Sequence, residues 1–237
     1  MSLIARTRQL MTTLNMPTNL RYTTSEVGDP EARYIEAWQK NCIRPNAFYE
    51  EHAENRTYFY SVDLQGRLFL EETSPKNIAT SLKSDKFLNF FFKQLRWNNT
   101  GEFNSYPFFS PCGPEKNYIR PACLPIVFHD MLHSDLIFGG NLIQSFNPRN
   151  LAMSVKSGRM FHKLEHVNDG VKRIKTSMQK SGNDWGLVKS SVAGRIAQRI
   201  EYKDDTLYYV DDKGNEHKIN NLPDEHESES WGLPNNL

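Results

Sequence analysis

Few cysteines and no long apolar run occur in this sequence, and each shortage excludes a class of protein. The three cysteines, Cys42, Cys112 and Cys123, are an odd number, and none belongs to a Cys-x-x-Cys pair. They provide no disulfide framework, which indicates a compartment that is reducing or only weakly oxidising. No stretch approaches the roughly 18 consecutive apolar residues that a membrane-spanning helix requires. We therefore expect a soluble protein.

An excess of charge of either sign is also missing. The 237 residues include 29 Lys and Arg and 28 Asp and Glu, so the net charge is close to zero and indicates no particular charged partner. The length suits one domain, or two small subdomains that share a core. Hydrophobic residues make up 38% of the chain and aromatic residues 12%. Because each large ring buries much surface, a hydrophobic core can form.

Acidic residues are absent from the start of the chain, where the first carboxylate is Glu26. Residues 1–25 hold Arg6, Arg8 and Arg21 and are rich in Ser and Thr. An acid-free, arginine-bearing, amphipathic start of this kind is typical of a mitochondrial presequence, and the alternative is an ordinary frayed terminus. We predict that residues 1–25 are a presequence and that the protein resides in the mitochondrial matrix.

The rest of the chain is predicted to have three parts. Residues 26–57 form an N-terminal extension whose short helix, 31–40, follows a proline at its first turn. Residues 58–222 form the globular domain. Residues 223–237 are acidic and polar, which predicts a disordered tail.

Hairpins are predicted near both ends of the globular domain. Aromatic and β-branched residues at 58–62 precede a turn at 63–66, and the chain returns as a strand at 67–70. A similar aromatic strand, Val-Asp and glycine turn recur at 207–219. Either the two halves are similar subdomains, or both simply use the residues that turns favour.

Apolar spacing predicts the helices. A helical region opens at Ser74-Pro75, and its second part, capped by Ser84 or Asp85, places Phe87, Phe91 and Leu95 four residues apart with 90–92 in the core. Further helices are predicted at 171–178 and 186–200, and further strands at 102–109, 117–120, 125–128, 136–138 and in a hairpin over 142–161. The expected fold is α+β, with antiparallel hairpins and sheets packed against the helices 87–95 and 186–200.

One stretch, 106–117, combines aromatics, prolines, a glycine, a cysteine and a carboxylate. The prolines restrict the backbone and predict a stiff turn at 110–113 whose side chains have fixed directions. Such a turn either frames a pocket or ends a strand. The candidate ligand-binding residues are Tyr106, Ser110, Cys112, Glu115 and Asn117. Cys112 could be a nucleophile or a buried structural thiol, and no histidine lies in the turn to activate it.

The residues His162, Glu165 and His166 match the H-x-x-E-H pattern of inverted zinc peptidases. In that pattern two histidines one helical turn apart bind zinc. No clear third carboxylate ligand follows on a helix, so the alternative is an ordinary polar segment.

Basic residues are concentrated between 172 and 203 and could meet a phosphate backbone. The acidic residues that follow them could instead neutralise this face within the protein. The candidate nucleic-acid contacts are Lys172, Arg173, Lys175, Lys180, Lys189, Arg195, Arg199 and Lys203.

Several blocks of the sequence resemble an uncharacterised eukaryotic family, uncharacterised protein family (UPF) number 0598. The blocks are 58–63, 65–70, 91–96, 106–113 with Glu115 and Asn117, 125–128 and 185–190. The resemblance spans roughly residues 58–202 and implies a mitochondrial protein of no established activity. Two departures are Pro114, where the family tends to have arginine, and the absence of an acidic residue just before Pro125.

No pattern in the sequence completes a catalytic constellation. We therefore predict a non-enzymatic mitochondrial binding or assembly factor whose site lies at 106–117. The alternatives are a hydrolytic or thiol-dependent enzyme that uses Cys112 or the His162/Glu165/His166 trio, and an RNA-binding protein that uses the basic face. The cofactor stays unknown, and the partner is expected to be an unidentified mitochondrial protein or small molecule.

Overall fold

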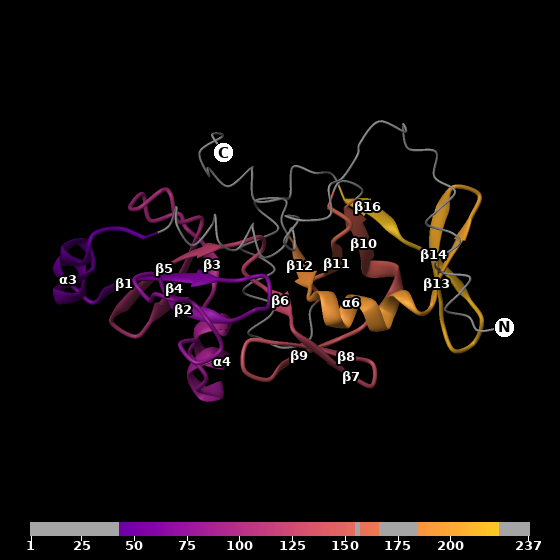
Figure 1. Ribbon diagram of the computed structural model, residues 1–237, viewed down its shortest axis with the longest axis horizontal. Coiled ribbons are helices and arrows are strands. Elements are labelled where there is room, and N and C mark those ends of the chain that lie inside the picture. The colour runs from indigo at the N-terminus through magenta and orange to yellow at the C-terminus, as the bar shows by residue number, and fades with distance from the viewer. Residues whose placement is uncertain (1–42, 155–156, 166–183, 223–237) are drawn as a thin grey trace, which may run out of the picture. The chain divides into compact units, whose positions relative to one another are not determined.

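The computed structural model describes residues 43–154, 157–165 and 184–222, all within one compact unit (Figure 1). These residues mix helices with strands in four sheets, which confirms the predicted α+β class. The helices are α3 (Asn46–Glu54), α4 (Asp85–Lys93), α6 (Ser190–Ala197) and the short 3-10 helix η1 (Pro148–Asn150). No helix among these residues is long and apolar enough to cross a membrane.

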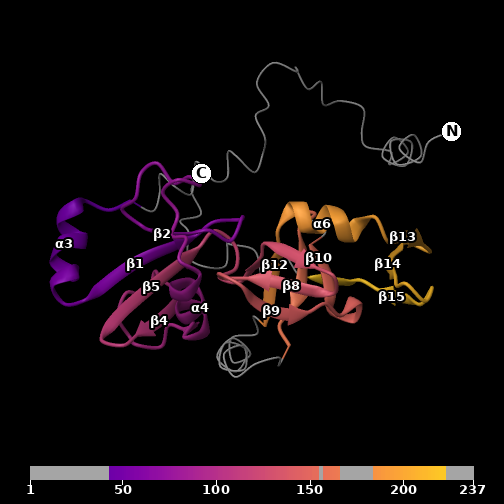
Figure 2. The ribbon, with the colours of Figure 1, turned by 90° about the horizontal axis from the view of Figure 1, so that it is seen from below.

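The N-terminal sheet, here sheet A, has five strands in the order β2-β1-β5-β4-β3 (Figure 2). β1 pairs antiparallel with β2 but parallel with β5, and β4 is antiparallel to both of its neighbours. The sheet is therefore mixed, which the predicted antiparallel arrangement did not include. Its strands are β1 (Thr57–Val62), β2 (Leu68–Leu70), β3 (Arg96–Trp97), β4 (Phe108–Cys112) and β5 (Glu115–Pro121).

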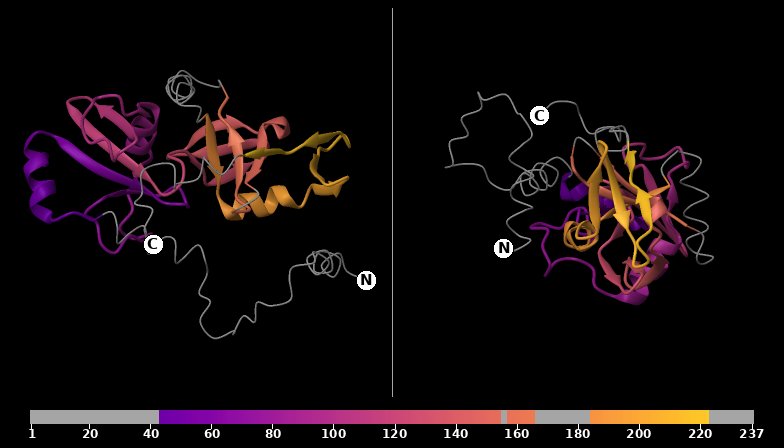
Figure 3. Two further views of the ribbon diagram at one scale, coloured as in Figure 1. Left: turned by 90° about the horizontal axis from the view of Figure 1, so that it is seen from above. Right: turned by 90° about the vertical axis from the view of Figure 1, so that its right-hand side faces the viewer.

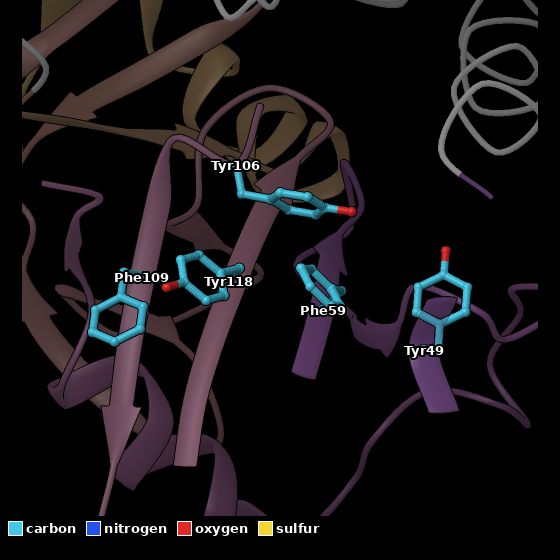
Figure 4. Close-up of a cluster of buried hydrophobic side chains, with 5 residues drawn as sticks. All are labelled: Tyr49, Phe59, Tyr106, Phe109 and Tyr118. Atoms are coloured by element: carbon cyan, nitrogen blue, oxygen red, sulfur yellow. The ribbon is translucent and has the colours of Figure 1, made fainter. Parts of the chain in front are cut away.

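Different helices cover the two faces of sheet A. On one face Phe91 of α4 packs against Tyr60, with ring centroids 5.0 Å apart. The opposite face carries a cluster of buried rings from α3, β1, β4, β5 and the loop before β4 (Figure 4). Its members are Tyr49, Phe59, Tyr106, Phe109 and Tyr118. Because Tyr49 belongs to this core, the folded region begins before residue 58.

The helix α4 forms where its spacing predicts, and Ser84 caps it by accepting a hydrogen bond from the Phe87 amide. Phe91 is fully buried, whereas Phe90 is 47% exposed, so the prediction that all of 90–92 is core is wrong at Phe90. A helix places consecutive side chains about 100° apart, and three in a row cannot all face the sheet.

The helical region predicted from Ser74 does not form before α4; residues 74–83 make turns instead. The Asn77 side chain accepts hydrogen bonds from the amides of Ala79 (2.8 Å) and Thr80 (3.2 Å). Side-chain bonds of this kind compete with helical backbone bonds, which explains why the helix starts later.

Three further sheets follow in the chain (Figure 3). Sheet B has the order β16-β10-β11-β12-β6, with parallel pairing of β10 with β16 and of β12 with β6. Its strands are β6 (Val127–Phe128), β10 (Leu151–Ser154), β11 (Met160–Lys163), β12 (Trp185–Val188) and β16 (Asn220–Leu222). Sheet C contains β7 (Asp130–Leu132), β8 (Asp135–Phe138) and β9 (Leu142–Ser145), and sheet D contains β13 (Ile200–Lys203), β14 (Thr206–Val210) and β15 (Glu216–Lys218).

The predicted helix 186–200 is wrong at both ends. Residues 185–188 form β12, the helix α6 starts only at Ser190, and residue 200 begins β13. A Cβ on Gly186 would lie 2.5 Å from the Phe128 ring, so glycine permits close packing of β12 there. The predicted hairpin 142–161 is also divided, since β9 pairs with β8 and β10 pairs with β11. The predicted helices 31–40 and 171–178 lie outside the described residues.

The two similar hairpins occupy different positions in their sheets. β1 has a parallel neighbour, whereas β14 lies between two antiparallel strands. Their turns nevertheless share one device: Asp63 accepts bonds from the amides of residues 65 and 67, and Asp211 accepts from those of residues 213 and 215. The Asp and Gly that the two hairpins share are therefore the residues that an aspartate-capped turn uses.

Candidate ligand-binding site

The predicted turn at 110–113 is part of a tight hairpin. Ser110 and Cys112 lie in β4, Glu115 starts β5, and only Gly113 and Pro114 connect the two strands. Gly113 has φ 64°, as the first position of a two-residue hairpin turn requires. Pro111 is tolerated in β4 because the outer strand β3 pairs only with residues 108 and 109.

The strand alternation divides the predicted site residues between two faces of sheet A. Ser110 is fully buried on the α4 side, where its hydroxyl donates to the Phe91 carbonyl (2.7 Å). Asn117 is its neighbour across the hairpin and donates to the Ser110 carbonyl (2.8 Å). Tyr106 belongs to the aromatic cluster on the other face. These residues therefore do not form one site.

Cys112 is a buried structural thiol in this arrangement. Its Sγ lies 3.6 Å from the Ser110 hydroxyl, and burial raises the pKa of the thiol, as does the nearby charge of Glu115. A nucleophilic cysteine needs a lowered pKa and access to its substrate. The geometry favours the structural alternative for Cys112.

A buried polar cluster lies on the face of sheet A that carries the aromatic cluster, and it was not predicted from the sequence. The Tyr106 hydroxyl donates to Glu71, which is fully buried, and the Arg120 guanidinium lies 3.9 Å from the second oxygen of Glu71. Arg120 also stacks over the Tyr106 ring at 4.4 Å. Burial raises the pKa of Glu71, and Arg120 opposes the rise. This cluster ties β2, β5 and the loop before β4 together.

Residues 162–165 of the H-x-x-E-H segment are not helical, which argues against the helical arrangement that the zinc-peptidase pattern requires. His162 lies on β11, is fully buried, and uses both ring nitrogens within the protein. Its Nε2 contacts the amide and carbonyl of Asn147 (3.0 and 3.1 Å), and its Nδ1 contacts Gln144 Nε2 (2.9 Å) and the Lys163 carbonyl (2.8 Å).

Glu165, the other described residue of that pattern, adds no metal site. Glu165 accepts hydrogen bonds from the side chains of Asn147 and Asn150, and His166 lies outside the described residues. Within 43–154, 157–165 and 184–222 no group of three His, Cys, Asp or Glu residues could hold a metal ion.

The basic face is partly neutralised by local ion pairs. Arg195 pairs with Asp130 (2.7 Å), Arg199 with Asp212, and Lys203 with Glu201 (2.8 Å) and Glu216. Lys189 precedes α6 and is half-buried. The remaining predicted contacts, Lys172, Arg173, Lys175 and Lys180, lie outside the described residues.

An open groove of about 440 Å³, here the α3 groove, runs between α3 and the β1–β2 hairpin. Aromatic, small and acidic side chains from these elements line it. They are Asn46, Tyr49, Glu50, Ala53, Thr57, Tyr58, Phe59, Leu70 and Glu72. The groove was not predicted because the only helix expected in residues 26–57 was 31–40. The signal for α3 was the spacing of Phe48 and His52, which are four residues apart, as on one face of a helix, and whose ring centroids lie 4.5 Å apart.

Negative charge dominates the α3 groove. Glu50 is exposed and Glu72 half-buried, and neither has an ion-pair partner among the residues that the structure describes. The Tyr49 hydroxyl accepts a hydrogen bond from the Arg44 amide (2.9 Å). Burial raises the pKa of Tyr49 to about 12, and the charges of Glu71 and Glu72 contribute to the rise. The groove therefore combines ring faces with two unneutralised carboxylates.

Comparison with known proteins places the chain in a family without a known activity. The crystal structure of a DUF1285 family protein from Silicibacter pomeroyi DSS-3 is similar at a TM-score of 0.41 and 13% identity, over 75% of this chain and 85% of that one. Residues 49–223 match the family model described as Domain of unknown function (DUF4505). The resemblance to UPF number 0598 stays a prediction. Since the match covers most of the chain, the protein belongs to the DUF4505 family.

Proposed function

We propose that the protein is a non-enzymatic binding or assembly factor of the mitochondrial matrix and that its ligand occupies the α3 groove. The observation that carries this proposal is the groove itself, a concave surface of about 440 Å³ lined by Tyr49, Tyr58 and Phe59. Ligand sites are typically concave, largely apolar and of this size, with a few polar groups that fix orientation.

The reactive side chains support binding over catalysis because the fold already uses them. Cys112 is buried with a raised pKa, and the ring nitrogens of His162 are hydrogen-bonded to Gln144, Asn147 and the adjacent Lys163. We therefore propose the α3 groove as the binding site, in place of the hairpin at 106–117 that the sequence suggested. The matrix location in the proposal rests on the acid-free, arginine-bearing composition of residues 1–25.

Affinity purification of the full-length tagged protein from mitochondria, with and without nuclease, tests the proposal. Ala53 lines the groove, so Ala53→Trp should fill it and remove the co-purifying proteins. Ala47 is an exposed position of the same helix outside the groove, so Ala47→Trp is the matched control and should retain them. A partner set that ignores Ala53→Trp, or a turnover that disappears on Cys112→Ala, would overturn the proposal.

A further inference from the structure

We infer that the α3 groove binds an arginine side chain presented by a segment of a partner protein. This inference rests on the proposed function and adds the chemistry of the ligand. It follows from three features of the groove: its unneutralised carboxylates, its ring faces and its neutral hydrogen-bonding groups.

The carboxylates select a cation. Glu50 projects from α3 and Glu72 follows β2, so the two acidic side chains come from different elements that border the same groove. No described residue that lines the groove carries a positive charge. A cation bound in the groove can form charge-assisted hydrogen bonds with these carboxylates.

The aromatic lining selects a flat, weakly hydrated cation. Tyr49 and Phe59 belong to the buried aromatic core, so of the three rings that line the groove only the half-buried Tyr58 is open to a ligand. A guanidinium stacks on aromatic faces and loses less hydration than an ammonium ion does, which favours arginine over lysine. The same chemistry occurs within the protein beside the groove, where Arg44 lies 4.9 Å from the centre of the Phe48 ring.

The remaining residues that line the groove can contact the rest of a peptide around its arginine. Asn46 offers an amide, while Ala53 and Leu70 offer apolar contact for the side-chain stem and its neighbours. A guanidinium has five N–H donors in a fixed fork and can contact two carboxylates at once. A segment of protein therefore fits this groove better than a compact amine does.

Binding of one short peptide to the full-length protein tests the inference. The probe is acetyl-Leu-Arg-Leu-amide, and its control contains citrulline, a neutral isostere, in place of arginine. We expect the arginine peptide to shift the backbone NMR signals of residues in α3 and β1. The citrulline peptide should bind about tenfold or more weakly, because a charge-assisted hydrogen bond is about twice as strong as a neutral one.

Matched charge variants locate the effect. Glu50→Gln with Glu72→Gln removes both groove carboxylates, whereas Glu51→Gln with Glu54→Gln removes two exposed carboxylates of α3 that lie outside the groove. The first pair should weaken binding of the arginine peptide about tenfold or more, and the second pair should change it less than about twofold. Equal effects of the two pairs, or equal binding of both peptides, would overturn the inference.

Two further outcomes separate this inference from the proposed function. If free arginine amide binds as tightly as the peptide, the groove holds a small molecule and the assignment to a protein segment falls. If Ala53→Trp removes the mitochondrial partners but the Glu50/Glu72 variant retains them, the binding function stands and the ligand chemistry is wrong. If neither variant changes the partners, both fall.

Discussion

Acidification from pH 7 to pH 4 should destabilise the folded protein through His162. Burial lowers the pKa of this imidazole to about 4, and its hydrogen bonds to Lys163 and Asn147 only partly oppose the effect. In the unfolded chain the pKa of a histidine is about 6.5. Below pH 6.5 the unfolded state therefore binds a proton that the folded state does not, and stability falls as the pH drops.

The size of this loss follows from the two pKa values. The imidazole is almost neutral in the folded protein until the pH approaches 4, so the loss grows through the window from about 6.5 to about 4. At 1.36 kcal/mol for each pH unit, and with half of the folded protein protonated at pH 4, His162 contributes a loss of about 3 kcal/mol. Such a loss is a large fraction of the stability of an ordinary domain.

Urea denaturation at pH 7, 6, 5 and 4 measures this contribution. Asparagine does not titrate in this range, so His162→Asn should lose about 3 kcal/mol less than the wild type between pH 7 and pH 4. His133 is exposed with φ 53°, a conformation that asparagine also tolerates, so His133→Asn is the control and should follow the wild type. Parallel curves for the wild type and His162→Asn would refute the reasoning. If that variant does not fold, an imidazole NMR signal of His162 that titrates near pH 6.5 in the wild type would refute it equally.

Three further predictions concern packing and reactivity. Gly186→Ala should cost about 1–3 kcal/mol in urea denaturation because its Cβ meets the Phe128 ring, whereas Gly194→Ala in α6 has open space and should stabilise by about 0.5–1 kcal/mol; the reverse order would contradict this. Glu71→Gln should destabilise by about 3 kcal/mol or more, since it removes a fully buried carboxylate that lies 3.9 Å from the Arg120 guanidinium. A loss no larger than that of Tyr106→Phe, which removes only the hydroxyl hydrogen bond to Glu71, would contradict a role for the charge. In a Cys42→Ser background, iodoacetamide at pH 7.5 should modify the buried Cys112 and Cys123 only after unfolding. Rapid labelling of the folded protein would contradict this expectation by showing that one of them is accessible.

Sequence reasoning succeeded where the decisive interactions are local. The cap at Ser84 and the apolar spacing to Phe91 act within one helix, and both are confirmed. The turns at Asp63 and Asp211 depend on amides two and four residues away. These features need no knowledge of the tertiary structure.

The failures have tertiary causes. The parallel pairing of β1 with β5 depends on contacts between residues near 57 and 116, and no pattern within either strand specifies its partner. Val188 matches the helical spacing that continues to Val192 and Ile196, yet the pairing of β12 with β11 and β6 overrides it. For the same reason the α3 groove could not be predicted from the sequence, since it exists only because α3 packs beside the β1–β2 hairpin.

The order of strands along the chain has a consequence for how this protein can acquire its structure. Every strand of sheet A lies between residues 57 and 121, so this sheet can close once that stretch has emerged from the ribosome or crossed a membrane in extended form. Sheet B instead draws its strands from residues 127–222, and its parallel partner for β10 arrives last, with Asn220–Leu222. Because a chain delivered from its N-terminus folds its early contacts first, β10 keeps an unpaired edge until residues 220–222 have been delivered, and a chaperone can bind this edge throughout that time.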